Sequence, residues 1–161
     1  MVRSATAQDF SFFYSLYMHP QINPFLMYEQ MDEEAFQPIF HDLQSQNQLF
    51  VFEYEGQMAG MFKIVPFAHR TSHIAYLGGV AIHPDFAGKG LGTQMLHEII
   101  AHCGERGFLR LELSTATINE RAIKLYEKVG FEKEGVYRNY CWLKSENRFL
   151  DEVVMSYLYP Q

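Results

Sequence analysis

Residues Val80 to Thr93 read VAIHPDFAGKGLGT and carry the strongest structural signal in this chain. A run of strand-forming residues gives way to a proline and then to three alternating glycines at the start of a helical pattern. Glycines at such a turn let the backbone approach a ligand closely and direct successive N–H groups at it. The first turn of the following helix adds free N–H groups and positive potential. The stretch therefore predicts an anion cradle for a diphosphate.

Two other phosphate motifs fail on spacing. A P-loop places Ser or Thr after its Gly-Lys pair, but Lys89 is followed by Gly90. The dinucleotide fingerprint separates its last two glycines by two residues, and here only Leu91 lies between Gly90 and Gly92. Glycines also precede helices for packing reasons, so the loop by itself leaves that alternative open.

A second segment, NERAIKLYEKVGF, spans Asn119 to Phe131. It predicts a helix that Asn119 caps and that Gly130 ends. This helix would carry Tyr126 toward the ligand that the cradle holds. The alternative is that Tyr126 is an ordinary core tyrosine on an amphipathic helix.

Hydrophobic periodicity and turn residues divide the rest of the chain. The predicted strands are 2–6, 49–54, 58–65, 72–82, 108–114, 131–143 and 149–157. The predicted helices are 7–18, 32–44, 90–103 and 119–129. Gly78 and Gly79 interrupt the strand at 72–82, which indicates a bulge or a close backbone approach.

This order of elements predicts an α/β fold with a single mixed, largely antiparallel central sheet. The sheet would have about seven strands and about four flanking helices, since short turns join most of the strands. Only the strand–helix–strand unit around the glycine loop requires a parallel pair. The loop would therefore lie at the carboxyl end of an inner strand, where α/β folds bind ligands.

Bulk composition excludes several classes of protein. The length of 161 residues suits one domain over 1–161, and 48% hydrophobic and 20% charged residues argue against disorder. No stretch approaches the roughly 20 apolar residues of a membrane span, and the first residues lack the apolar core of a signal peptide. Cys103 and Cys141 show no metal-ligand spacing. We therefore expect a soluble, cytoplasmic protein without a metal site and without a membrane partner.

The formal net charge of −6 argues against a nucleic-acid partner, because clustered Lys and Arg supply most phosphate affinity. An acidic protein attracts cations at long range, which mildly favours an amine as substrate. The sequence leaves the oligomeric state open, with a homodimer as one option.

Taken together, the two segments resemble the GNAT superfamily of N-acetyltransferases. The pyrophosphate loop of that family reads Arg or Gln, two residues, Gly, one residue, then Gly or Ala, and residues 87–92 occupy these places. Residues 119–131 are similar to its Asn-x-x-Ala-x-x-Leu-Tyr-x-x-x-Gly-Phe segment at every named position. The predicted order of elements also matches its acyl-CoA N-acyltransferase fold. One departure is Ala87 at the Arg or Gln position, where a lost phosphate contact costs about 1–3 kcal/mol.

The resemblance implies acetyl-CoA as the acyl donor and the amine of a small molecule, such as an amino acid or a polyamine, as the acceptor. It implies that Tyr126 is the general acid that protonates the departing thiolate. It also implies cofactor contacts from Val80, Ala81, Ile82, Ala87, Gly88, Lys89, Gly90, Leu91, Gly92, Thr93 and Asn119. Two alternatives use the same motifs: a protein N-terminal acetyltransferase, and a non-catalytic acyl-CoA-binding module.

The general base stays open at this point. Many members of the family carry a glutamate on the fourth strand, at the place that aligns with Tyr76 in this chain. Glu112 on the adjacent strand is the nearest carboxylate by motif spacing, and it is our candidate base. His83, Asp85 and a water relay are the alternatives. Substrate contacts are expected from four aromatic side chains: Phe25, Tyr28, Tyr76 and Tyr140.

Overall fold

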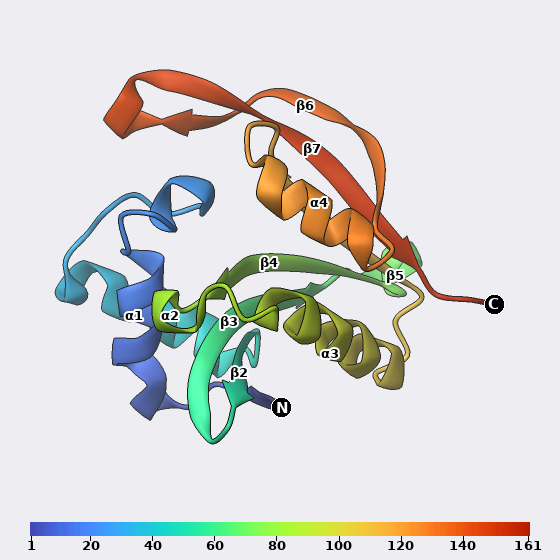
Figure 1. Ribbon diagram of the computed structural model, residues 1–161, viewed down its shortest axis with the longest axis horizontal. Helices are drawn as coiled ribbons and strands as arrows, with labels where there is room; N and C mark the ends of the chain where they lie inside the picture. The colour runs from blue at the N-terminus through green and yellow to red at the C-terminus, as the bar shows by residue number, and fades with distance from the viewer.

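The computed structural model describes residues 1–161, which form one seven-stranded sheet with helices on both faces (Figure 1). The strands are β1 (Val2–Ser4), β2 (Leu49–Tyr54), β3 (Gln57–Pro66), β4 (Ile74–Ile82), β5 (Arg110–Ala116), β6 (Glu132–Leu143) and β7 (Arg148–Leu158). The helices are α1 (Phe10–Tyr17), α2 (Glu33–Ser45), α3 (Leu91–Glu105) and α4 (Glu120–Lys128). The strand order is β1-β2-β3-β4-β5-β7-β6.

The predicted α/β fold and its mixed, largely antiparallel sheet are confirmed. Every neighbouring pair of strands is antiparallel except β4 and β5. This parallel pair flanks α3, as the strand–helix–strand unit around the glycine loop requires. None of the helices combines the length and the apolar composition needed to cross a bilayer.

Two apolar layers hold the helices on the sheet. On one face, α3 and α4 pack over buried residues of β2 to β5 and β7. On the other face, α1 and α2 pack over the alternate residues of β2 and β3. Phe50 and Phe52 therefore belong to the first layer, whereas Leu49 and Val51 belong to the second. These four neighbours are all buried, as expected for a strand covered on both faces.

The parallel pair separates soon after it begins, and this separation determines where a ligand can enter. Residues Ile74 to Tyr76 of β4 pair with Arg110 to Glu112 of β5, and the pairing ends there. Beyond this point β4 pairs only with β3, and β5 pairs with β7. Figure 1 shows β4 and the β6–β7 hairpin diverging on either side of α4. The edge of β4 that faces β5 thus has unpaired backbone groups.

The predicted bulge at Gly78 and Gly79 is confirmed. The register between β3 and β4 shifts so that Met61 lies opposite Ala81 while Lys63 lies opposite Gly78. Gly79 has a φ of 57°, a left-handed conformation that glycine adopts at little cost. The extra residue bends β4 at the point where it leaves β5.

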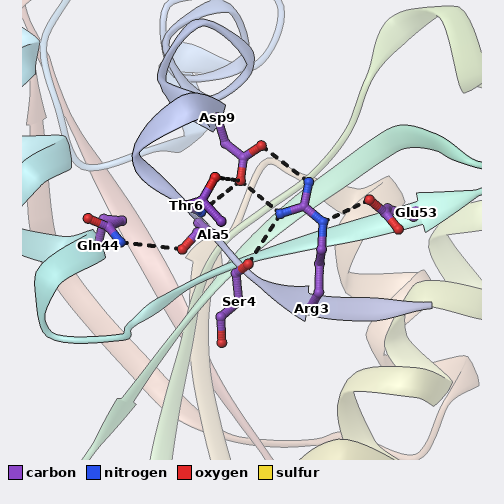
Figure 2. Close-up of polar contacts among 7 residues, drawn as sticks. All are labelled: Arg3, Ser4, Ala5, Thr6, Asp9, Gln44 and Glu53. Atoms are coloured by element: carbon purple, nitrogen blue, oxygen red, sulfur yellow. Dashed lines mark hydrogen bonds and ion pairs between the residues drawn. The ribbon is translucent and has the colours of Figure 1, made fainter.

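A network of charged side chains links β1 to the residues just before α1 (Figure 2). The Arg3 guanidinium donates hydrogen bonds to Asp9 Oδ2 at 2.8 Å and to Glu53 Oε1 at 2.7 Å. The backbone N–H of Thr6 donates to the same Asp9 oxygen at 2.8 Å. Asp9 is only 6% exposed, so this carboxylate depends on these donors for its solvation.

We expect Asp9→Asn to lower the free energy of unfolding by about 2 kcal/mol at neutral pH, because it leaves Arg3 without its buried partner. Burial raises the pKa of Asp9, but the bonds from Arg3 and Thr6 outweigh it, and the pKa lies below 3.8. Stability from Asp9 is therefore full above about pH 4 and is lost as the pH falls below that value. Urea unfolding at neutral pH and at about pH 3 should show that the difference in unfolding free energy between the wild type and Asp9→Asn is smaller at the lower pH. Asp42→Asn, at an exposed site, is the control; an equal loss in both variants would contradict the account.

Candidate active site

A cavity of about 680 Å³ opens where β4 and β5 diverge. Its wall is formed by β4, the glycine loop, the first turn of α3, one face of α4, and the segment between α1 and α2. The wall is mostly apolar, with a small number of charged and hydroxyl groups. This is the usual composition of a small-molecule site.

The start of α3 presents free backbone donors to this cavity. Helix α3 begins at Leu91, and its N-cap residue, Gly90, has a φ of 72° and provides no side-chain cap. A Cβ atom at Gly90 would meet no heavy atom within 4 Å, so glycine is needed here for its backbone conformation and not for space. The N–H groups of the first turn are therefore available to an anionic ligand.

All but one of the predicted cofactor residues line the cavity: Val80, Ala81, Ile82, Ala87, Gly88, Gly90, Leu91, Gly92, Thr93 and Asn119. Lys89 is the exception, and its predicted contact with the cofactor stays a prediction. Its Nζ atom lies 5.4 Å from the centre of the Phe86 ring, and the side chain does not line the wall.

Positive charge comes instead from α4. Arg121, Lys124 and Lys128 line the cavity at the spacing of one helical face. Sequence reasoning missed these three residues, although their spacing was visible in the second motif. Ala87 also lies on the wall and contributes no charge there.

The side chain of Asn119 bonds to β5 and not to the first turn of α4. It stands at the N-cap position of α4, but its side chain makes no capping hydrogen bond. Its Nδ2 atom donates to Thr115 Oγ1 at 3.3 Å, at the end of β5. The predicted N-cap position is therefore confirmed, but the capping hydrogen bond is absent, and the amide is held against the cavity wall by the neighbouring strand.

Tyr126 projects from α4 into the core and reaches the cavity wall. It is 8% exposed, and its ring packs against Phe131 with centroids 5.8 Å apart. Burial raises the pKa of the phenol, and the nearby Tyr76 and Glu152 add to that effect. The hydroxyl therefore keeps its proton throughout the neutral range and can donate it.

Glu112, the predicted base, and a second carboxylate, Glu152, lie in different places. Glu112 is not on the cavity wall, and its Oε1 atom accepts two hydrogen bonds from the Arg110 guanidinium at 3.1 and 2.9 Å. Glu152 on β7 is the only carboxylate on the wall. It is 6% exposed and accepts a hydrogen bond from Ser114 Oγ at 2.7 Å. Sequence reasoning missed Glu152, although an acidic residue inside the apolar run of β7 was a usable signal.

Three of the four predicted substrate residues, Phe25, Tyr28 and Tyr76, line the cavity. Tyr140 does not: it is 50% exposed on β6, with its ring 4.7 Å from that of Tyr137. Its predicted contact with the substrate therefore receives no support from this position and stays a prediction.

His83 and Asp85, the alternative bases, also lie off the wall. The His83 ring accepts a hydrogen bond from the Asp85 backbone N–H at 3.1 Å, which shapes the turn before the glycine loop. No group of three or more His, Cys, Asp or Glu side chains is arranged to hold a metal ion.

The bulge at Gly79 supplies a stability test of this wall. A Cβ atom at Gly79 would lie 2.6 Å from the hydroxyl oxygen of the buried Tyr17. We expect Gly79→Ala to cost about 2–4 kcal/mol of unfolding free energy, from backbone strain plus the clash. Gly56→Ala is the matched control, because its φ is 75° and a Cβ there would meet nothing within 4 Å. Urea unfolding of both variants would contradict this reasoning if their losses were equal, and Tyr17→Phe should relieve part of the Gly79→Ala loss.

The comparison with protein families gives one match that covers most of the chain. The model of the acetyltransferase (GNAT) family matches residues 10–131. Among curated proteins, the chain is similar to a ribosomal protein bS18 alanine N-acetyltransferase of Salmonella typhimurium, with 39% identity over 66 residues. That alignment covers 41% of this chain and 45% of the relative, so it spans about half of either protein.

Solved structures share the fold over nearly the whole chain. A ribosomal-protein-alanine N-acetyltransferase from Brucella melitensis superposes with a TM-score of 0.81 at 24% identity, covering 99% of both chains. A spermidine N-acetyltransferase from Vibrio cholerae, solved in complex with CoA and spermine, superposes with a TM-score of 0.85 at 19% identity, covering 98% of this chain and 94% of the other. The family match, the shared fold and the glycine cradle agree with one another, and the chain belongs to the acetyltransferase (GNAT) family.

Proposed function

We propose that the protein is an acetyl-CoA-dependent N-acetyltransferase that acts on the amine of a small molecule, with residues 1–161 as its single N-acetyltransferase domain. One observation carries this proposal: a single cavity joins the glycine cradle at the start of α3 to the hydroxyl-bearing Tyr126 and the carboxylate of Glu152. The Vibrio cholerae relative with this fold was solved with CoA bound, which supports the same donor here.

The cavity wall has polar groups suited to the successive parts of acetyl-CoA. The free N–H groups at Leu91, Gly92 and Thr93 suit the diphosphate. Arg121, Lys124 and Lys128 add positive charge along the same wall, which would offset the Arg or Gln missing at residue 87. The unpaired edge of β4 suits the amide-containing pantetheine arm, in the way that an extended peptide adds to a sheet edge.

Acyl transfer to an amine requires three things from the protein. The attacking nitrogen must lose a proton as the new C–N bond forms, the carbonyl oxygen needs hydrogen-bond donors, and the leaving sulfur needs a proton as the C–S bond breaks. In this proposal Glu152 receives the proton from the amine, because it is the carboxylate on the wall. Backbone N–H groups of β4 between Gly79 and Ile82 support the oxygen. Tyr126 gives its proton to the sulfur and regains one from solvent or from Glu152.

Glu112, the base expected from motif spacing, receives no support from its position beside Arg110. Its role stays an untested prediction. Glu112→Gln and Glu152→Gln would separate the two carboxylates, since only the residue that takes the amine proton should change the acidic limb of the pH–rate profile.

A protein amino terminus is the second candidate acceptor. The observation that favours it is a cluster of exposed aromatic side chains on the β6–β7 hairpin: Tyr137, Tyr140, Trp142 and Phe149. Tyr137 of this cluster pairs with Glu152 in the β6–β7 ladder, so the cluster borders the candidate site. The similarity to an enzyme that acetylates a ribosomal protein points the same way.

The test is a thiol-release assay with acetyl-CoA against a broad panel of small amines and of peptides with free amino termini. We expect release of the free thiol with small amines. Release with peptides alone would replace the first candidate by the second. Binding of acetyl-CoA with no release for any amine would leave a non-catalytic acyl-CoA-binding module.

A further inference from the structure

One lysine on the cavity wall has no carboxylate partner in the protein. Lys63 lies on β3 opposite Gly78, and its side chain faces the cavity beside the bulge of β4. Its Nζ atom makes no ion pair and lies over the Tyr28 ring, 5.8 Å from the centroid. Burial lowers the pKa of Lys63, and no carboxylate offsets this effect. A partly buried cation in this position is costly unless a ligand supplies its counter-ion.

The carboxylate of Glu152 lies elsewhere on the same wall. Three tyrosines line the same wall: Tyr17 is buried, and Tyr28 and Tyr76 are half-buried. The Tyr17 and Tyr28 rings lie 5.6 Å apart at their centroids, and burial raises the pKa of Tyr17. Burial raises the pKa of Tyr76 to about 12, and Glu152 adds to that effect. Lys63 and Glu152 thus stand at separate points of one surface lined by neutral hydroxyl groups, and they do not neutralise each other.

The other cations on the wall belong to a different side of the cavity. Arg121, Lys124 and Lys128 all come from α4, which packs with α3 on one face of the sheet. Tyr28, whose ring Lys63 overlies, packs against the apolar layer of α1 and α2 on the opposite face. The three α4 cations therefore lie with the glycine cradle, and Lys63 lies with the segment between α1 and α2.

We propose that the acceptor is an amine that also carries a carboxylate, the class that includes free amino acids, with its ammonium group toward Glu152 and its carboxylate toward Lys63. This inference rests on the proposed function and narrows it. A cation such as spermidine has no group for Lys63 and would direct a second positive charge at it, which disfavours binding. A substrate that carries both an ammonium group and a carboxylate provides a counter-ion for Glu152 and for Lys63.

Matched pairs of acceptors test this directly, because each pair differs only in the carboxylate. Suitable pairs are phenylalanine with phenethylamine, γ-aminobutyrate with propylamine, and lysine with cadaverine. The wild-type protein is expected to favour the carboxylate-bearing member of at least one pair by about tenfold or more in kcat/KM, the scale of one charged contact. Lys63→Gln should reduce that preference about 10- to 100-fold, while Lys63→Arg should keep it within about threefold.

Two controls distinguish a failure of this inference from a failure of the proposed N-acetyltransferase activity. Lys144→Gln removes the same charge from an exposed site off the wall and should keep the preference. The dissociation constant of acetyl-CoA, measured for every variant, should change by less than about twofold in Lys63→Gln, since the lysine faces the acceptor.

Three results would overturn the inference while the proposed function stands: no pair in which the wild-type protein favours the carboxylate-bearing member, turnover of peptides alone, or an equal loss for both members of the favoured pair in Lys63→Gln. A weaker affinity for acetyl-CoA in Lys63→Gln would also overturn it, by assigning the lysine to the donor. Failure of the wild-type protein to bind acetyl-CoA at all would instead overturn the proposed function, and this inference with it.

Discussion

Tyr126→Phe is expected to lower the turnover number by about 10²- to 10³-fold, the usual contribution of a general acid. The thiolate that leaves an acyl thioester is then released without a proton from the protein. The phenol carries this proton at neutral pH, because burial and the neighbouring Tyr76 and Glu152 raise its pKa. The dissociation constant of acetyl-CoA should change by less than about twofold, since the substitution removes only a hydroxyl from the wall.

Steady-state kinetics with calorimetric titration of acetyl-CoA separates these two quantities. Tyr159→Phe is the matched control, because its hydroxyl donates a hydrogen bond to the Ile100 carbonyl at 2.6 Å, away from the cavity. That control should lose about 1 kcal/mol of unfolding free energy and keep its turnover. Turnover of Tyr126→Phe within about threefold of wild type would show that Tyr126 is not the acid.

Gly90→Val is expected to weaken the binding of acetyl-CoA by about 30-fold or more, which corresponds to roughly 2 kcal/mol. Gly90 holds a φ of 72° at the N-cap of α3. A β-branched residue avoids this conformation, so the loop must rearrange and its N–H groups no longer converge on the diphosphate. The wall itself has room, because a Cβ atom at Gly90 meets nothing within 4 Å.

Gly107→Val provides the control for backbone strain at the other end of α3. Gly107 also has a left-handed φ, 86°, with nothing within 4 Å of a Cβ atom, and it does not line the cavity. Both variants should lose similar unfolding free energy, but only Gly90→Val should lose affinity. An equal affinity in the two variants would mean that the cradle does not hold the cofactor.

The parts of this molecule that sequence predicts well are those whose residues are adjacent in the chain. The glycine loop, the start of α3 and the parallel β4–β5 pair follow from one continuous stretch, and the bulge at Gly79 follows from two neighbouring glycines. Local spacing also placed Tyr126 on α4, on the face that packs inward. The fold followed from the order of these elements.

The proposed acceptor side could not be predicted in this way, because its residues come from strands far apart in the chain. Lys63, Ser114 and Glu152 belong to β3, β5 and β7. Whether such residues meet depends on where β4 leaves β5 and on how the register shifts, which no single segment encodes. Glu112 was chosen by its distance from a motif, and the observed contact with Arg110 was invisible at that level. Tyr140 was placed by its neighbours in sequence, yet an irregularity in β6 between Tyr137 and Cys141 puts it on the outer surface.

Calorimetric titration of the wild-type protein with acetyl-CoA tests the central claim most directly, because every proposed step depends on the donor lying in the cavity between β4 and β5. We predict saturable binding of one molecule per chain, with a dissociation constant between about 1 μM and 1 mM, the usual range for enzyme substrates. The absence of saturable heat at millimolar concentrations, confirmed by an unchanged melting temperature, would contradict the account.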